Sequence, residues 1–354
     1  MSSLQVGRPV LVRGVLFSLA LVIPIALGFF FQAFPLVSSG ALGAMFALLI
    51  DPKRGLLLRV IAIGAGGALV VAAAALGVLV HGHHWLSLAL LFLLSWLAAQ
   101  PKPEHAYLGL LVKYAAVAVL LASFGFHASW DLAFAFLGGI TLGICLSLVG
   151  MLYEEKDDGG SEPLDEFRAV LHGDTNDRLF GLAVPVTVLA ATLTARYFAF
   201  GHPAWVGLTV LFVMHTDGAT ELHHIRDRVL GTFLGVLASS ALLYSTTSLL
   251  AITFGVAVSA FFIPVAGKTR YMAFSFAITC AVLLLIDIAM FLQGGDFNLL
   301  RWRLIDTVSA CVWVLASNLV VRLIQKRPRR QAGAPGNSAP AADPASATDP
   351  GQKQ

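Results

Sequence analysis

Three ionisable residues lie inside long apolar stretches of the sequence. Lys113 follows Leu-Leu-Val, Asp287 lies within Leu-Leu-Leu-Ile-Asp-Ile-Ala-Met, and Asp306 follows Arg303 by three residues at the start of the last apolar stretch. Charged side chains in such surroundings are costly and are therefore candidates for function. Apolar surroundings also favour the neutral form of a carboxylate, which lets it exchange a proton near neutral pH. We predict that Asp287, Asp306 and Arg303 take part in proton coupling. The alternative for Arg303 and Asp306 is a static ion pair that fixes the end of a helix. The alternative to a functional role for Lys113 is a side chain that extends to the aqueous interface.

A second group of residues could bind a small organic anion. Arg59, Arg226 and Arg228 stand at the ends of apolar stretches, and Trp205 lies in a short one. Arginine holds a carboxylate through two parallel hydrogen bonds, and an indole stacks on an aromatic ring. We therefore predict Arg59, Trp205, Arg226 and Arg228 as substrate-binding residues. Anchoring of the chain at a membrane surface is the alternative for the arginines.

Small residues follow Arg228 at helical spacing. Gly231, Thr232 and Gly235 stand in an apolar stretch, and the two glycines are four residues apart. This spacing lets a neighbouring helix approach closely. Gly231, Thr232 and Gly235 are predicted to pack against another helix.

The sequence predicts no metal, no cofactor and no catalytic centre. Three histidines at 81, 83 and 84 have the spacing to bind a divalent ion, but no carboxylate or cysteine lies nearby, so no metal site is expected there. No phosphate-binding glycine-rich loop and no Gly-x-Ser-x-Gly motif occurs. We expect neither an enzyme nor an ATP-driven transporter.

The composition is that of a membrane protein. Of 354 residues, 58% are hydrophobic and 12% are charged, against about 25% charged in soluble proteins. This excludes a soluble enzyme, a disordered scaffold and a nucleic-acid binder. Twelve apolar stretches are candidate membrane helices, and those at 36–50, 85–99 and 204–215 are short. The stretches lie at 11–31, 36–50, 57–80, 85–99, 106–125, 132–152, 179–200, 204–215, 229–246, 248–266, 271–292 and 303–324. The predicted fold class is an all-α polytopic membrane protein of about twelve transmembrane helices.

Positive charges predict the orientation. With the N-terminus inside, 19 of the 23 lysines and arginines fall in inner connections or the tail, and three fall outside. Basic residues favour the cytoplasmic side. Both termini are therefore predicted to be cytoplasmic.

The chain divides into two similar halves. Residues 1–152 form the first six-helix half and 179–325 the second. Between them, 153–178 form an acidic cytoplasmic linker with a short helix expected around 164–171, and 326–354 form a basic and then disordered cytoplasmic tail. An even number of helices in each half gives both the same orientation, which predicts a parallel repeat.

The second half resembles the fusaric acid resistance (FUSC-type) and aromatic acid exporter superfamily. Arg228, Gly231, Thr232 and Gly235 match its Arg-x-x-Gly-Thr-x-x-Gly pattern, which follows a tryptophan-containing span. Residues 303–307 match its Arg-x-x-Asp-Thr motif. The first half departs from both motifs, and the linker is much shorter than the cytoplasmic domain that many members carry.

The resemblance implies export of small aromatic carboxylic acids across a bacterial inner membrane, driven by the proton motive force. It also implies a periplasmic adaptor protein as a partner, and a homo-oligomer stays open. Plant relatives behave as anion channels, so a passive anion channel is one alternative. A non-transporting scaffold of the cell envelope is another.

Overall fold

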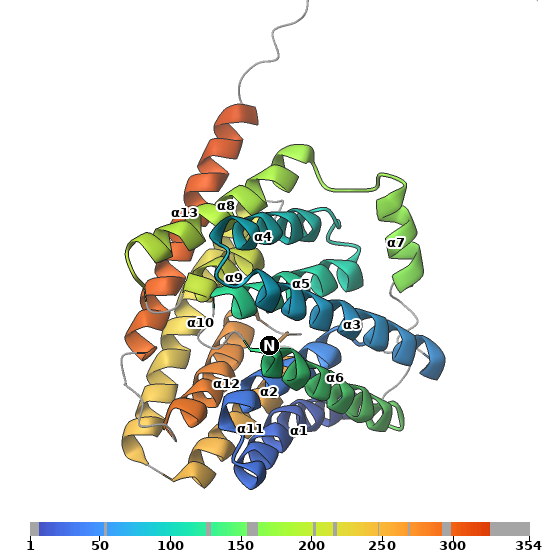
Figure 1. Cartoon of the computed structure of the whole chain (residues 1–354), viewed down its shortest axis with the longest axis vertical. Coiled ribbons are helices and arrows are strands. Elements are labelled where there is room, and N and C mark those ends of the chain that lie inside the picture. The colour runs from blue at the N-terminus through green and yellow to red at the C-terminus, as the bar shows by residue number, and fades with distance from the viewer. Residues whose placement is uncertain are drawn as a thin grey trace, which may run out of the picture.

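A computed structural model describes most of the chain. It covers residues 7–52, 55–124, 129–153, 162–200, 203–214, 218–246, 248–267, 270–291 and 299–325, without the side chains of 34–35, 218–221, 287, 289–291 and 299–301. Within these ranges the structure is entirely helical, which confirms the predicted class (Figure 1). The predicted tail, 326–354, lies outside the described residues.

Thirteen helices are described. They are α1 (Arg8–Phe31), α2 (Phe34–Leu49), α3 (Leu56–Val80), α4 (His84–Ala99), α5 (Ala106–Phe124), α6 (Trp130–Met151), α7 (Pro163–Leu171), α8 (Arg178–Tyr197), α9 (Pro203–Val213), α10 (Gly218–Ser245), α11 (Leu249–Gly267), α12 (Tyr271–Phe291) and α13 (Leu299–Gln325).

Eight of these helices are long and apolar enough to cross a membrane: α1, α3, α5, α6, α8, α10, α11 and α13. The chain is thus a multi-pass membrane protein. The short stretches of the sequence are short helices here as well, because α2 and α4 have 16 residues each and α9 has 11. At a rise of 1.5 Å per residue, α9 extends over about 16 Å, roughly half of a hydrocarbon core. Twelve complete crossings therefore remain a prediction.

Proline begins several helices, and a left-handed residue ends the first. Prolines stand in the first turn of α1, α2 and α7, where a backbone N–H has no partner within the helix and its loss costs little. Gln32 ends α1 with a φ of 56°. The sharp turn that follows brings α2 back against α1.

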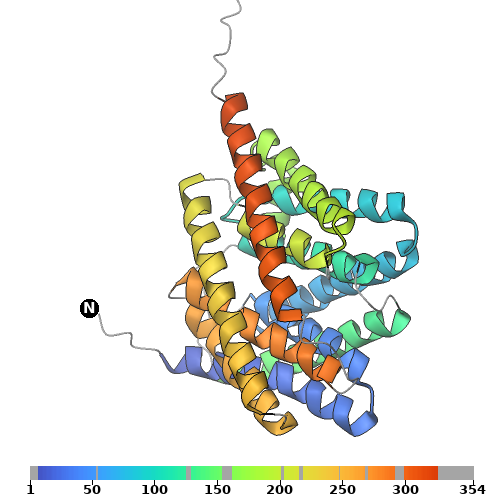
Figure 2. The same cartoon turned by 90° about the vertical axis from the view of Figure 1, so that its left-hand side faces the viewer.

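Helix contacts follow the same plan in both halves (Figure 1). In the first half α2 packs on α6, α3 on α5 and α4 on α5; in the second half α9 packs on α13, α10 on α12 and α11 on α12. Between the halves α1 packs on α11 and α4 on α8, while α5 packs on α9 and α2 on α12. If α1 is taken to correspond to α8, α2 to α9 and so on to α6 and α13, every contact above has an equivalent contact among the others. Figure 2 shows α10 and α13 side by side on one face.

Polar contacts group the helix ends into two sets. At one end Arg13 meets Asp51, and Asn176 donates to the carbonyl oxygens of Ala99 and Pro101. At the other end lie an Arg196–His84 contact of 3.1 Å and a His81–Ser123 contact of 3.1 Å. These are the two sets that the positive charges predict to face opposite sides of the membrane. Which set faces the cytoplasm remains a prediction.

The linker helix α7 lies where the sequence predicts a short helix, apart from the other helices at the edge of Figure 1. Its Glu166 is buried and accepts backbone hydrogen bonds from Leu108 (2.8 Å) and Tyr107 (3.4 Å). A carboxylate at a helix N-terminus satisfies N–H groups that lack partners within the helix. Glu166 thus attaches α7 to the start of α5.

Candidate functional site

Two charged residues are buried on α13. Arg303 is 6% exposed and Asp306 is 0% exposed. The guanidinium carbon of Arg303 lies 3.9 Å from the centroid of the Trp205 ring on α9. A cation over the face of an indole is stabilised by the ring quadrupole. The first turn of α9 thus carries a tryptophan that covers the arginine of α13.

The polar atoms of this pair have few partners. Among the described residues, neither carboxylate oxygen of Asp306 accepts a hydrogen bond, and the Nε and Nη1 atoms of Arg303 donate none. No ion pair within 4.0 Å joins the two side chains. Buried polar groups without partners are costly, and within membrane helices they are found at functional sites. The closed Arg303–Asp306 ion pair is therefore not the arrangement in this structure.

Arg228 lies in the same interior. It is on α10, is 4% exposed, and its carbonyl oxygen accepts a hydrogen bond of 3.4 Å from Ser275. Its guanidinium is within electrostatic range of Tyr271, of Cys311 on α13 and of Arg303. The structure thus brings together two arginines, Trp205 and Asp306, which the sequence separates by about a hundred residues.

Arg226 faces away from this interior. Its side chain is exposed and forms an ion pair of 2.9 Å with its neighbour Asp227. It therefore does not join Arg228, although the two arginines are two residues apart.

Gly231 and Gly235 are the points where α10 meets α12. A Cβ atom on Gly231 would lie 2.5 Å from the carbonyl oxygen of Met272, and one on Gly235 would lie 2.9 Å from the Cβ of Thr279. Thr232 is fully buried, and its hydroxyl has no hydrogen-bond partner among the described residues. The close approach of the two helices is thus possible only without side chains at 231 and 235.

Arg59, which the sequence predicts as a substrate-binding residue, is bound to other groups of the protein. It is 2% exposed, its Nε lies 2.9 Å from Asp51, and its Nη1 donates to the carbonyl oxygen of Ser147 at 2.9 Å. Asp51 also accepts from the Ser147 hydroxyl at 2.8 Å and pairs with Arg13 at 3.4 Å. Asp51 is not among the residues predicted from the sequence, where its one signal is that it ends an apolar stretch directly before a proline.

Asp287 is on α12, but its side chain lies outside the described residues. Helices α12 and α13 both pack on α10. Leu283 of α12, Val236 of α10 and Leu304 of α13 share one small apolar cluster. Whether Asp287 approaches Asp306 remains a prediction.

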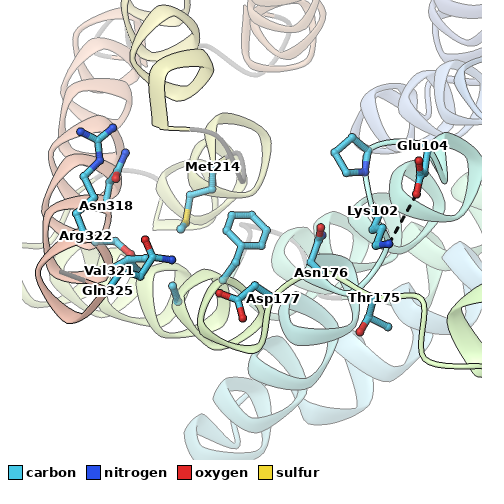
Figure 3. A pocket seen from close by; sticks show the side chains of 14 residues that line it. Lys102, Glu104, Thr175, Asn176, Asp177, Met214, Asn318, Val321, Arg322 and Gln325 are labelled. Carbon is cyan, nitrogen blue, oxygen red and sulfur yellow. Dashed lines mark ion pairs between the residues drawn. The ribbon is translucent and has the colours of Figure 1, made fainter. Parts of the chain in front are cut away.

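Two adjoining cavities open at the helix ends predicted to be cytoplasmic. The outer cavity has a volume of about 710 Å³ and lies between the α4–α5 connection, the start of α8 and the end of α13 (Figure 3). In Figure 3, Asn318 and Arg322 stand on one side, Lys102 and Glu104 on the other, and Met214 between them. The inner cavity, of about 270 Å³, shares Lys102, Asn176 and Met214 with it and extends to Lys113.

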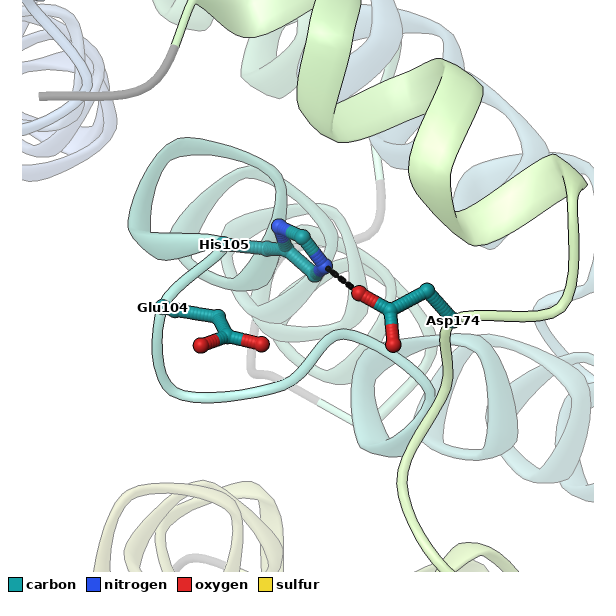
Figure 4. Close-up of side chains that lie close together, drawn as sticks. All are labelled: Glu104, His105 and Asp174. Atoms are coloured by element: carbon teal, nitrogen blue, oxygen red, sulfur yellow. Dashed lines mark hydrogen bonds and ion pairs between the residues drawn. The ribbon is translucent and has the colours of Figure 1, made fainter. Parts of the chain in front are cut away.

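Glu104, His105 and Asp174 form the one described cluster with metal-ligating side chains (Figure 4). His105 Nε2 lies 3.1 Å from Asp174. Lys102 also bonds Asp174 and lies 3.9 Å from Glu104, so the carboxylates already have a cation. This cluster ties the α4–α5 connection to the segment before α8, which is a structural contact.

The comparison with known families agrees with the resemblance seen in the sequence. Residues 189–317 match the family described as fusaric acid resistance protein-like. No curated protein and no solved structure matches the chain. The match begins within α8 and ends within α13. The second half of this chain therefore matches the fusaric acid resistance protein-like family, and Trp205, Arg228, Arg303 and Asp306 all lie inside that match.

Proposed function

We propose that this protein exports small organic anions, with aromatic carboxylates as the substrate class, and that proton entry drives the export. The family match and the apolar helices support a transport function. The observation that carries the proposal is Asp306: a carboxylate with no exposed surface and no hydrogen-bond partner among the described residues, three residues from Arg303. Such a group can exchange a proton without breaking other contacts.

The substrate would bind between Arg228, Arg303 and Trp205. Two guanidinium groups attract a carboxylate, and the indole offers a flat face for an aromatic ring. Arg226 would act earlier, as an exposed cation on the cytoplasmic side that raises the local concentration of anions. Arg59 would bind substrate only if it released Asp51. Asp287 would serve as a second proton group on α12.

Coupling requires that Asp306 has one protonation state when the loaded protein changes from inward-facing to outward-facing and the other state when the empty protein returns. The loaded protein would open outward with Asp306 ionised, and the empty protein would return with Asp306 protonated. One proton would then enter for each anion that leaves, so two charges move in the favourable direction. A membrane potential supplies about 2.3 kcal/mol per charge per 100 mV, so the potential and the pH gradient act together.

The finer points of the architecture belong to the same proposal. The parallel repeat is supported by the matching helix contacts of the two halves. The distribution of positive charge supports twelve crossings with both termini in the cytoplasm. The resemblance supports a place in the bacterial inner membrane and a periplasmic adaptor as partner.

The test is uphill transport in inside-out membrane vesicles. With an acidic lumen, the wild type should accumulate labelled benzoate, and an ionophore that collapses the proton gradient should abolish accumulation. Asp306→Asn should lose accumulation and still elute as a folded protein. Asp131→Asn, which removes an exposed carboxylate from the first turn of α6, is the matched control and should transport normally.

Two results would contradict the proposal. Full accumulation by Asp306→Asn would remove the coupling role of that residue. Benzoate movement in the wild type that only dissipates its own gradient would identify a passive anion channel.

A further inference from the structure

The inner cavity has a basic and apolar lining. Its basic residues are Lys102, His105 and Lys113, and none of its lining residues is an aspartate or glutamate. The other lining residues are Ala98, Ala99, Pro101, Pro103, Ala106, Gly109, Leu110, Asn176, Phe180, Val184, Leu211 and Met214. The outer cavity differs, since Glu104 and Asp177 line it together with Lys102 and Arg322 (Figure 3). An anion that moves inward thus leaves carboxylates behind.

Two of the three basic residues already have a carboxylate partner. Asp174 stands beside the cavity, bonds Lys102 and lies 3.1 Å from His105 Nε2 (Figure 4). Lys113 has no hydrogen bond or ion pair with any described residue. It is the cation of this cavity whose charge is not balanced by a contact.

Lys113 lies at the interface of the two halves. It is seven residues beyond the start of α5, about 10 Å along the helix axis. Helix α5 packs on α9, and the Lys113 Nζ lies 5.8 Å from the centroid of the Phe212 ring. Phe212 does not line the cavity; the aromatic side chain in its lining is Phe180, in the first turn of α8. The combination of a cation, an aromatic ring and apolar walls fits an anion with a small aromatic body.

We propose that Lys113 and Phe180 form an entry subsite, in which Lys113 binds the carboxylate of a small aromatic acid and Phe180 contacts its ring. The subsite rests on the proposed function, since it is the first stop of an anion on its way to Arg228 and Trp205. It assigns a binding role to α5 of the first half, where the family match does not extend.

The test is binding to the purified full-length protein in detergent. Equilibrium dialysis with labelled benzoate gives the number of sites and the Kd of each for the wild type, Lys113→Met and Lys113→Arg, which separates the entry subsite from the site at Arg228 and Trp205. Loss of a hydrogen bond between charged groups should raise the Kd of one of the two sites about 10- to 100-fold in Lys113→Met. Lys113→Arg should keep most of the affinity, and Phe180→Leu should weaken binding without abolishing it. The control Arg196→Met removes a cation at the opposite helix ends and should bind as the wild type does.

The competitors define the ligand. Benzamide, which has the ring but not the charge, should compete poorly, and excess inorganic phosphate should not displace benzoate. Wild-type affinity in a Lys113→Met protein that elutes as a single folded species would overturn the subsite. So would the absence of benzoate binding to the wild type, or displacement by phosphate alone.

Binding and transport separate the two proposals. If benzoate binding depends on Lys113 but the wild type fails to accumulate benzoate against its gradient, the subsite stands and proton-driven export falls. If accumulation is driven by protons but binding is independent of Lys113, export stands and the subsite falls.

Discussion

At the scale of single residues, the buried ion pair between Arg59 and Asp51 should matter more for stability than the exposed pair between Arg226 and Asp227. Removing one partner of a buried pair costs about 3–5 kcal/mol when the other charge is left uncompensated, and less here because Asp51 keeps its contacts with Arg13 and Ser147. An exposed pair contributes only about 0–1 kcal/mol. Arg59→Met should therefore lower the melting temperature in detergent much more than Arg226→Met, as thermal unfolding would show. Similar melting temperatures for the two variants would contradict a structural role of Arg59.

Residues of the site were predictable where a chemical type was out of place in its surroundings. Asp306 and Arg303 stood out because charges are rare in apolar stretches. The contact of Arg303 with Trp205 was not predictable, because it joins α9 to α13 and no spacing within the sequence encodes it. Asp51 was missed for the same reason, since its importance comes from Arg13 and Arg59 on two different helices.

At the scale of helices, the contact between α10 and α12 should depend on Gly231. In Gly231→Ala the new methyl group would meet the Met272 carbonyl oxygen, which is backbone and can shift only with α12. Overpacking of this kind costs about 1–3 kcal/mol, so the melting temperature should fall. Gly64→Ala on α3 is the control, because no atom lies within 4 Å of the place that its methyl group would take and alanine is favoured over glycine in helices by about 0.5–1 kcal/mol. A fall of equal size at both positions would refute the close approach.

The tie between the α4–α5 connection and the segment before α8 should depend on pH. The hydrogen bond from Lys102, and then that from His105, hold the pKa of Asp174 below its usual value of 3.8. A lowered pKa in the folded protein contributes stability above the unfolded pKa, and this is lost as pH falls through the folded value. The difference in melting temperature between the wild type and Asp174→Asn should thus shrink as the pH falls below about 4. A difference that grew below that pH would contradict the tie.

Helices were more predictable than their packing. Each of the twelve apolar stretches forms a helix, and the short helix expected in the linker is α7. These helices were predictable because hydropathy and prolines at helix starts are properties of short, continuous segments of the sequence. The partners of each helix were not predictable, since α1 could have packed on any apolar face. The only feature of the packing that the sequence predicted was which helix ends lie on the same side, because lysines and arginines favour one side of the membrane.

At the scale of the whole molecule, the two sets of helix ends should lie on opposite sides of the membrane. In a cysteine-free background, Glu104→Cys and His83→Cys place single exposed thiols at the two ends. A membrane-impermeant maleimide added to intact cells should label His83→Cys, and Glu104→Cys only after the cells are permeabilised. Labelling of both from the same side would contradict a complete crossing by α4 (His84–Ala99), which separates the two positions.

The packing of α1 on α11 also has a consequence for biosynthesis. The Ser18 hydroxyl donates a hydrogen bond of 2.7 Å to the carbonyl oxygen of Ala257, and a Cβ on Gly14 would collide with Phe261. Helix α1 therefore completes its contacts only after more than two hundred further residues have been translated. Until then its α11-facing side is covered by lipid or by the insertion machinery. Helix α1 is thus translated well before α11 and reaches its final neighbours only after α11 has been made.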